Sequence, residues 1–138
     1  MLTSREIIET LGTKFGKQIL KAEEKVSNQV FVTIVPDALV PVVCFLNQAL
    51  SSRFLINAAT DRREQDGKYM VSYIFSFDRE KIFLCIQVAV DSTDPNIGSI
   101  TPIIAGANWS ERETRDLVGI NLRGHPDPRR LVLADDWP

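Results

Sequence analysis

His125 is the only histidine of this 138-residue chain, and it lies between a glycine and a proline. A histidine can act as a general base when a carboxylate orients its ring, and Asp127, Asp116 or Glu113 could supply that carboxylate. In the alternative interpretation the ring bonds to a neighbouring backbone group and fixes the turn. Because no companion nucleophile stands beside His125, the structural role is favoured. A small enzyme that uses His125 as its base is kept as an alternative function.

The motifs of phosphate, cluster and metal chemistry are absent from the sequence. Neither G-x-x-x-x-G-K-[ST] nor G-x-G-x-x-G occurs. Cys44 and Cys85 lie too far apart in sequence, and are too few, for a four-cysteine iron–sulfur cluster. Both lie in apolar patterns that predict buried free thiols in a reducing compartment. A lone histidine with scattered acids is a poor zinc site, so we expect no cofactor and no metal in this chain.

The densest pattern of charges, prolines and aromatic residues is the segment 108–138, which runs NWSERETRDLVGINLRGHPDPRRLVLADDWP. Ser110 and Glu113 have capping-box spacing, which predicts a helix starting at Glu111, and Gly119 is placed to end it. So short a helix is marginal alone and must pack on something. The prolines of 126–128 exclude helix and central strand, while later apolar residues argue against disorder. We predict a short helix followed by an extended arm that lies along a surface.

The motifs E-R-E, D-x-x-G-I, G-H-P-D-x-R-R and D-D-W, in this order, resemble the signature of the 30 kDa (C) subunit of respiratory complex I. The same domain occurs in related membrane-bound nickel–iron hydrogenases and F420H2 dehydrogenases. Residues 1–107 fit the family by their pattern of elements. The matching residues are 107–109, 111–113, Asp116, Gly119, Ile120, 124–126, Arg129, Arg130 and 135–137.

The resemblance implies a non-catalytic accessory or scaffold subunit of an NADH-quinone oxidoreductase-like or membrane-bound hydrogenase complex. Its arm would dock the large subunit, of the 49 kDa or hydrogenase-like type, beside the small iron–sulfur subunit. Iron–sulfur clusters, and nickel–iron, NAD or F420 groups where used, would belong to those partners. The chain would be cytoplasmic and attached peripherally to the membrane through its complex. A free-standing protein-binding module is the remaining alternative.

The resemblance also implies which residues meet the large subunit. By themselves the helix charges could form a solvated face, with Glu111 and Arg115 as a favourable pair. In the family this segment lies against the large subunit, where arginines can make bidentate bonds that specify orientation. Trp109, just before the expected cap, is predicted to pack within the chain, and Trp137 to dock on a partner. We expect Arg112, Asp116, Arg129 and Arg130 to be paired, some of them across the interface. The predicted interface residues are Trp109, Glu111, Arg112, Glu113, Asp116, His125, Arg129, Arg130 and Trp137.

Residues 1–107 predict the globular part, and residues 108–138 the helix and arm of the same domain. A capping box at Thr3 and Glu6 begins an amphipathic helix that Gly16 ends. A second such helix should have Pro41 in its first turn or at its start. Apolar alternation predicts strands at 18–25, 29–35, 54–60, 69–77 and 82–90, with a polar loop at 62–68 and a loop with one helical turn at 96–107. The apolar residues on both sides of the strand 29–35 predict that both its faces are covered. The fold class is α+β: two helices packed on a mostly antiparallel five-stranded sheet (α-β-β-α-β-β-β), with an extended C-terminal arm.

Composition narrows the range of partners. The chain has 44% hydrophobic and 25% charged residues and a net charge of −2, which is ordinary for a globular domain. This charge offers no attraction for nucleic acid or an anionic membrane surface. No apolar run approaches the roughly 20 residues of a spanning helix, and MLTSREIIE has no apolar signal core. We therefore expect no nucleic acid, no direct membrane span and no export.

Overall fold

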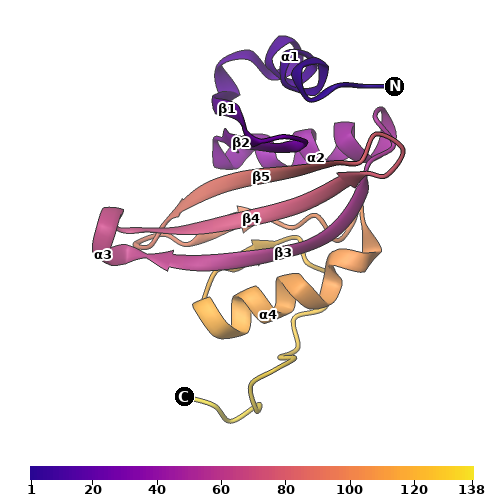
Figure 1. Ribbon diagram of the computed structural model, residues 1–138. Helices are drawn as coiled ribbons and strands as arrows, with labels where there is room; N and C mark the ends of the chain where they lie inside the picture. Colours follow the sequence, from indigo (N-terminus) through magenta and orange to yellow (C-terminus); the bar gives the residue numbers. More distant parts are fainter.

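A five-stranded mixed sheet carries the fold of the computed structural model, which describes residues 1–138. The strand order is β1-β2-β5-β4-β3, so β1 and β3 form the two edges (Figure 1). Every neighbouring pair is antiparallel except β2 and β5, which are parallel. The predicted α+β class with a mostly antiparallel sheet is confirmed. The strands are β1 (Ile19–Val26), β2 (Gln29–Ile34), β3 (Arg53–Arg62), β4 (Lys68–Phe77) and β5 (Ile82–Asp91).

Two of the helices show local features that the sequence predicts. In α1 (Ser4–Phe15) the Thr3 hydroxyl accepts a hydrogen bond from the Glu6 amide, and the Glu6 carboxylate accepts one from the Thr3 amide at 2.8 Å. This is the predicted capping box, and Gly16 ends the helix with a positive φ of 53°. In α2 (Leu39–Gln48) the proline lies in the first turn, where its missing N–H leaves no helical bond unmade.

The hydrophobic core lies on one face of the sheet. Along one row of paired residues this face presents Val32, Ile86, Tyr73 and Asn57, all buried. Ile7 and Leu11 of α1 and the apolar stripe of α2 belong to the same core. The alternating set Ile82 to Val90 of β5 points into it, as predicted.

No element of the chain covers the opposite face of the sheet, on which Phe83 is 51% exposed and Phe31 is only partly buried. The prediction that the strand at 29–35 is covered on both faces is therefore wrong for this chain by itself. The apolar residues at alternate positions of β2 in fact separate a core face from a face that is open to solvent.

The segment after the sheet differs from its prediction in two ways. The helix α4 (Asn108–Val118) begins before Glu111, and its N-cap is Ala107, which offers no side-chain bond. Ser110 is therefore inside the helix and does not cap it. The predicted loop 96–107 contains β6 (Asn96–Gly98), which pairs in parallel with β7 (Asn121–Arg123), as well as one 3-10 turn. The end of α4 is as predicted, because Gly119 adopts the left-handed conformation with φ 85°.

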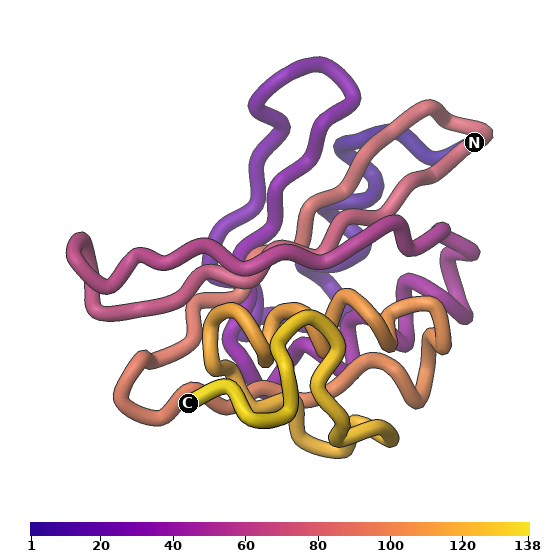
Figure 2. The backbone as a smooth tube through the Cα atoms, turned by 90° about the horizontal axis from the view of Figure 1, so that it is seen from below, coloured from indigo at the N-terminus to yellow at the C-terminus, as the bar shows by residue number.

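The polar loop 62–68 contains one helical turn, α3 (Arg63–Asp66), which Gly67 closes with a φ of 74°. After Arg123 the chain has no further helix or strand, and this arm, residues 124–138, lies against α4 (Figures 1 and 2). None of the four α-helices combines the length and the hydropathy needed to cross a bilayer.

Replacing Thr3 by alanine should lower the free energy of unfolding by about 1 kcal/mol, because the Glu6 amide at the start of α1 loses the hydroxyl that accepts its hydrogen bond. Thr3→Ser should retain most of the stability. Thr13→Ala, an exposed change inside the same helix, is the matched control. Urea denaturation measures all three, and an unchanged Thr3→Ala midpoint would contradict the role of the capping box.

Candidate partner-docking site

Glu111 is fully buried, and its carboxylate joins α4 to the loop that precedes it. It accepts hydrogen bonds from the Ser99 hydroxyl at 2.6 Å, the Ile100 amide at 3.0 Å, and both the amide and the hydroxyl of Thr101. Four donors satisfy a charge that burial would otherwise penalise heavily. The pKa of the Tyr73 hydroxyl is held well above its ordinary value, mainly because the hydroxyl is buried and also because of the negative charge of Glu111. The Glu111 side chain is therefore not accessible to a partner subunit.

The next face of α4 is tied to the edge strand β3. Asn57, 4% exposed, donates to the Thr114 hydroxyl at 3.2 Å and accepts from the Ser110 hydroxyl. Asn57 ends a buried row whose other members are Val32, Ile86 and Tyr73, and these bonds satisfy its buried amide. They place α4 over β3 and explain why Ser110 does not act as a cap.

Arg112 holds the arm against the helix. Its guanidinium donates to the carbonyl oxygens of Arg129 at 3.0 Å and Arg130 at 2.9 Å, and lies 3.3 Å from the Asp127 carboxylate. Arg115 donates to the same Arg129 carbonyl. Asp127 also pairs with the Arg129 side chain at 2.8 Å. Hydrogen bonds from Arg129, and then the positive charge of Arg112, hold the pKa of the Asp127 carboxyl well below its ordinary range.

Asp116 receives the backbone of the arm. One of its carboxylate oxygens accepts from the amides of Leu131 and Val132 at 2.8 Å each and from Leu133 at 3.3 Å. Burial alone would raise the pKa of Asp116, but these three amides outweigh it and hold the pKa below its ordinary value. Such a nest of amides around one oxygen replaces the secondary structure that the arm lacks.

The ring of His125 is bonded only to main-chain groups. The Asp127 amide donates to Nδ1 at 3.0 Å, so Nε2 carries the proton and donates to the Asn108 carbonyl oxygen at 3.1 Å. Both nitrogens are therefore occupied, and neither faces the carboxylate of Asp116, Asp127 or Glu113. The geometry is that of the turn-fixing role which the sequence favoured over a general base.

Two aromatic side chains that the sequence placed in different settings are both exposed. Trp109 on α4 is 69% exposed and Trp137 on the arm is 55% exposed. The expectation that Trp109 packs within the chain is therefore wrong. Leu117, two turns along the same face of α4, is 57% exposed, and Val132 on the arm is 54% exposed. We call the set formed by Trp109, Glu113, Leu117, Val132 and Trp137 the α4–arm surface.

The structure divides the predicted interface residues into two groups. Glu111, Arg112, Asp116 and His125 bond within the chain, and of the expected pairings those of Arg112 and Asp116 are internal. Arg129 pairs with Asp127 but is 79% exposed along its side chain, and Arg130 donates to the carbonyls of Ala134 and Trp137. The exposed members are Trp109, Glu113, Arg129, Arg130 and Trp137.

Sequence reasoning missed Leu117. Its signal was the i, i+4, i+8 spacing of Trp109, Glu113 and Leu117, which lines one face of a helix that starts early enough.

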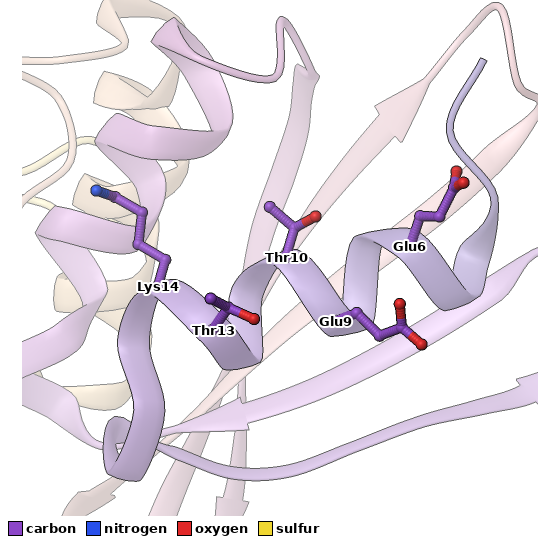
Figure 3. A pocket seen from close by; sticks show the side chains of 5 residues that line it. All are labelled: Glu6, Glu9, Thr10, Thr13 and Lys14. Carbon is purple, nitrogen blue, oxygen red and sulfur yellow. The ribbon is translucent and has the colours of Figure 1, made fainter.

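Two hollows of the surface carry no converging chemistry. The one over α1 is lined by Glu6, Glu9, Thr10, Thr13 and Lys14, all from one helix and pointing outward (Figure 3). A second, of about 390 Å³, lies between α4 and the arm and includes Arg115, Arg130 and Trp137. No group of three or more histidine, cysteine, aspartate and glutamate side chains is placed to hold a metal ion.

Glu111→Gln should destabilise the fold by about 1–3 kcal/mol, because the new amide nitrogen faces donors and leaves them unpaired. Glu113→Gln, an exposed change two residues away, should alter the free energy of unfolding little. Urea denaturation of both variants checks the difference. Equal midpoints would show that the four bonds to Glu111 contribute nothing net.

Acid should release the arm before the sheet unfolds. The pKa values of Asp116 and Asp127 are lowered in the fold, so their ionised forms stabilise the docked arm above the ordinary carboxyl pKa of about 4. That stabilisation is lost as the pH falls through the lowered folded-state values. Fluorescence of Trp137 in a Trp109→Phe background follows the arm, and far-ultraviolet circular dichroism follows the sheet.

The matched variant for this titration is Asp116→Ala, in which the arm should already be loosened at neutral pH. Coincident fluorescence and dichroism transitions in the protein with Asp116 intact would contradict an arm held separately by these carboxylates.

The comparisons with known proteins agree with the motifs of the C-terminal segment. Residues 32–138 match the family described as respiratory-chain NADH dehydrogenase, 30 Kd subunit. The C subunit of NADH-quinone oxidoreductase from Geobacter sulfurreducens is 30% identical over 99% of this chain and 85% of its own length. Hydrogenase-4 component G and formate hydrogenlyase subunit 5 of Escherichia coli (strain K12) are each 35% identical, over 96% and 95% of this chain. The chain spans only about a quarter of the length of these two, 24% and 23%.

Solved structures share the fold. A fragment of Nqo5, residues 1–134 of that protein, superposes with a TM-score of 0.74 at 20% identity, covering 88% of this chain and 98% of the fragment. A chain of the membrane-bound sulfane sulfur reductase, an archaeal respiratory membrane complex, superposes with a TM-score of 0.81 at 14% identity, covering 96% of this chain and 77% of that one. Because residues 32–138 match the family and a 30% identical C subunit is covered over 85% of its length, this chain belongs to the family of the 30 Kd subunit of respiratory-chain NADH dehydrogenase.

Proposed function

We propose that this chain is a non-catalytic accessory subunit of a complex I-like or membrane-bound hydrogenase complex, and that it docks the large subunit through its α4–arm surface. The observation that carries the proposal is the exposure of two tryptophans, at 69% and 55%, on elements whose backbones are firmly held. The names of the relatives support a role as a subunit of such a complex. They are the C subunit of NADH-quinone oxidoreductase, hydrogenase-4 component G and formate hydrogenlyase subunit 5.

The α4–arm surface has the composition of a docking site. Tryptophan is enriched at the centres of interfaces, where it contributes much of the binding energy. Here Trp109 and Leu117 supply apolar contacts on α4, while Val132 and Trp137 supply them on the arm. The exposed cations Arg129 and Arg130 can form a polar rim. Exposed apolar side chains of this kind, with polar residues around them, are typical of a surface that is buried against another folded subunit.

The surface is also formed in advance. Arg112 and Asp116 fix the backbone of residues 129–133, so the arm does not have to order when a partner arrives. Binding to a preorganised surface loses less conformational entropy. In a redox complex a rigid brace of this kind would keep the distance between partner-held electron carriers constant.

Redox groups are assigned by this proposal to partner subunits: iron–sulfur clusters in the small subunit, and nickel–iron, NAD or F420 sites where the complex has them. The contribution of this chain is positional. Through its partners it would attach peripherally to the cytoplasmic membrane.

Native co-purification from the source cells tests the proposal. The tagged chain should recover a large subunit and an iron–sulfur subunit, and Trp109→Ala/Trp137→Ala should reduce that recovery by about tenfold or more, since each truncation removes a hot-spot side chain. Leu20→Ala, an equally exposed apolar change on β1, should leave recovery unchanged. Recovery of the chain alone under gentle conditions would overturn the proposal.

A further inference from the structure

The outer edge of β3 is an unpaired strand edge with unusual composition. Ten residues long, β3 pairs only with β4, and none of the hydrogen bonds outside that ladder involves the backbone of residues 54–60. After a bulge between Phe54 and Ile56 the register with β4 runs without interruption to Arg62. Alternate amides and carbonyls of residues 56–60 therefore point outward with no partner in the chain.

The two edges of the sheet are built differently. The edge strand β1 carries Lys21, Glu23, Glu24 and Lys25, and charges of this kind prevent another strand from pairing. Residues 54–60 of β3 carry no charge and no proline. Instead they expose Leu55 by 37% and Ile56 by 52%. Only the β3 edge is therefore left suited to receive a strand.

The surroundings of this edge indicate what kind of strand fits. On the solvent-facing side of the sheet Ile56 is paired with Ile74 on β4, and Ile74 is paired with Cys85 on β5. This row of three residues makes that side of the sheet apolar. On the other side α4 covers the strand through its bonds to Asn57. Leu117 follows Thr114 by three residues and Ser110 by seven, so it is on the helical stripe of α4 that faces β3, and it is 57% exposed. A strand added here would have apolar neighbours on both faces.

We propose that the edge of β3 receives an uncharged strand of about five residues from the large partner subunit, which extends the sheet by one strand. This inference rests on the proposed function, because the edge is continuous with the α4–arm surface through Leu117. The tryptophans of that surface hold the partner by side-chain contacts. The β3 edge adds main-chain hydrogen bonds, which fix the register and the angle of the two subunits.

Amide hydrogen exchange on the intact complex tests the added strand directly. The outward-facing amides of residues 56–60 should exchange about tenfold or more slowly in the complex than in the isolated chain. Docking through side chains alone would not protect them. A complex that forms but leaves these amides unprotected would overturn the added strand while the proposed function stands. A chain that recovers no partner would overturn both.

A matched pair of variants gives a second readout. Ile56→Lys places a charge beside the edge of β3 and should weaken recovery of the large subunit by about tenfold. Leu20→Lys makes the same kind of exposed change on β1 and should have no effect. Thermal unfolding confirms that both variants fold. Protection of residues 56–60 in the isolated chain, together with a dimeric mass, would show that a second copy occupies the edge and would refute the assignment to the large subunit.

Discussion

The buried carboxylate of Glu111 is the constraint on which the C-terminal half of the structure depends. A charge taken out of water costs several kcal/mol unless donors replace its hydration, and here donors from residues 99–101 surround it. They can do so only if α4 lies in one place relative to the loop that leads into it. With α4 fixed, Ser110 and Thr114 reach Asn57 on β3 from one side of the helix. The same helix then offers Arg112 and Asp116 on another side, where the arm settles.

The arm shows how charged side chains can replace secondary structure. After Arg123 no ladder or helix satisfies its backbone, so Asp116 accepts its amides and Arg112 binds its carbonyls. These two residues were expected to serve an interface, yet most of their bonding capacity is used within the chain. The exposed residues of α4 and the arm include four large apolar side chains, those of Trp109, Leu117, Val132 and Trp137. In the arrangement proposed for the complex, charges therefore shape the surface and apolar side chains bind through it.

Local patterns predicted the sheet and its helices well, because capping boxes, glycine stops and strand alternation depend on neighbours in sequence. Thr3 with Glu6, Gly16, Gly119 and the apolar set of β5 all behave as those rules require. The prediction that Ser110 caps the helix failed although its spacing to Glu113 satisfies the capping rule. The hydroxyl of Ser110 instead bonds to Asn57, which lies 53 residues away in sequence. The prediction that Trp109 packs within the chain also failed. The helix starts at Asn108, three residues earlier than predicted, and the Trp109 side chain is exposed; no local rule predicts this earlier start.

A partner face made of a helix, a pinned arm and an open strand edge constrains more than a flat apolar patch would. Side-chain contacts at Trp109 and Trp137 tolerate some sliding, since apolar attraction has little direction. Main-chain bonds along β3 do not, because a slip of one residue moves every side chain of the added strand to the wrong face. In the proposed complex the two kinds of contact would meet near Leu117, which is on the stripe of α4 that faces β3. The side-chain contacts would supply affinity, and the main-chain bonds would fix the register. An accessory subunit would need both in order to hold its neighbours at a fixed geometry.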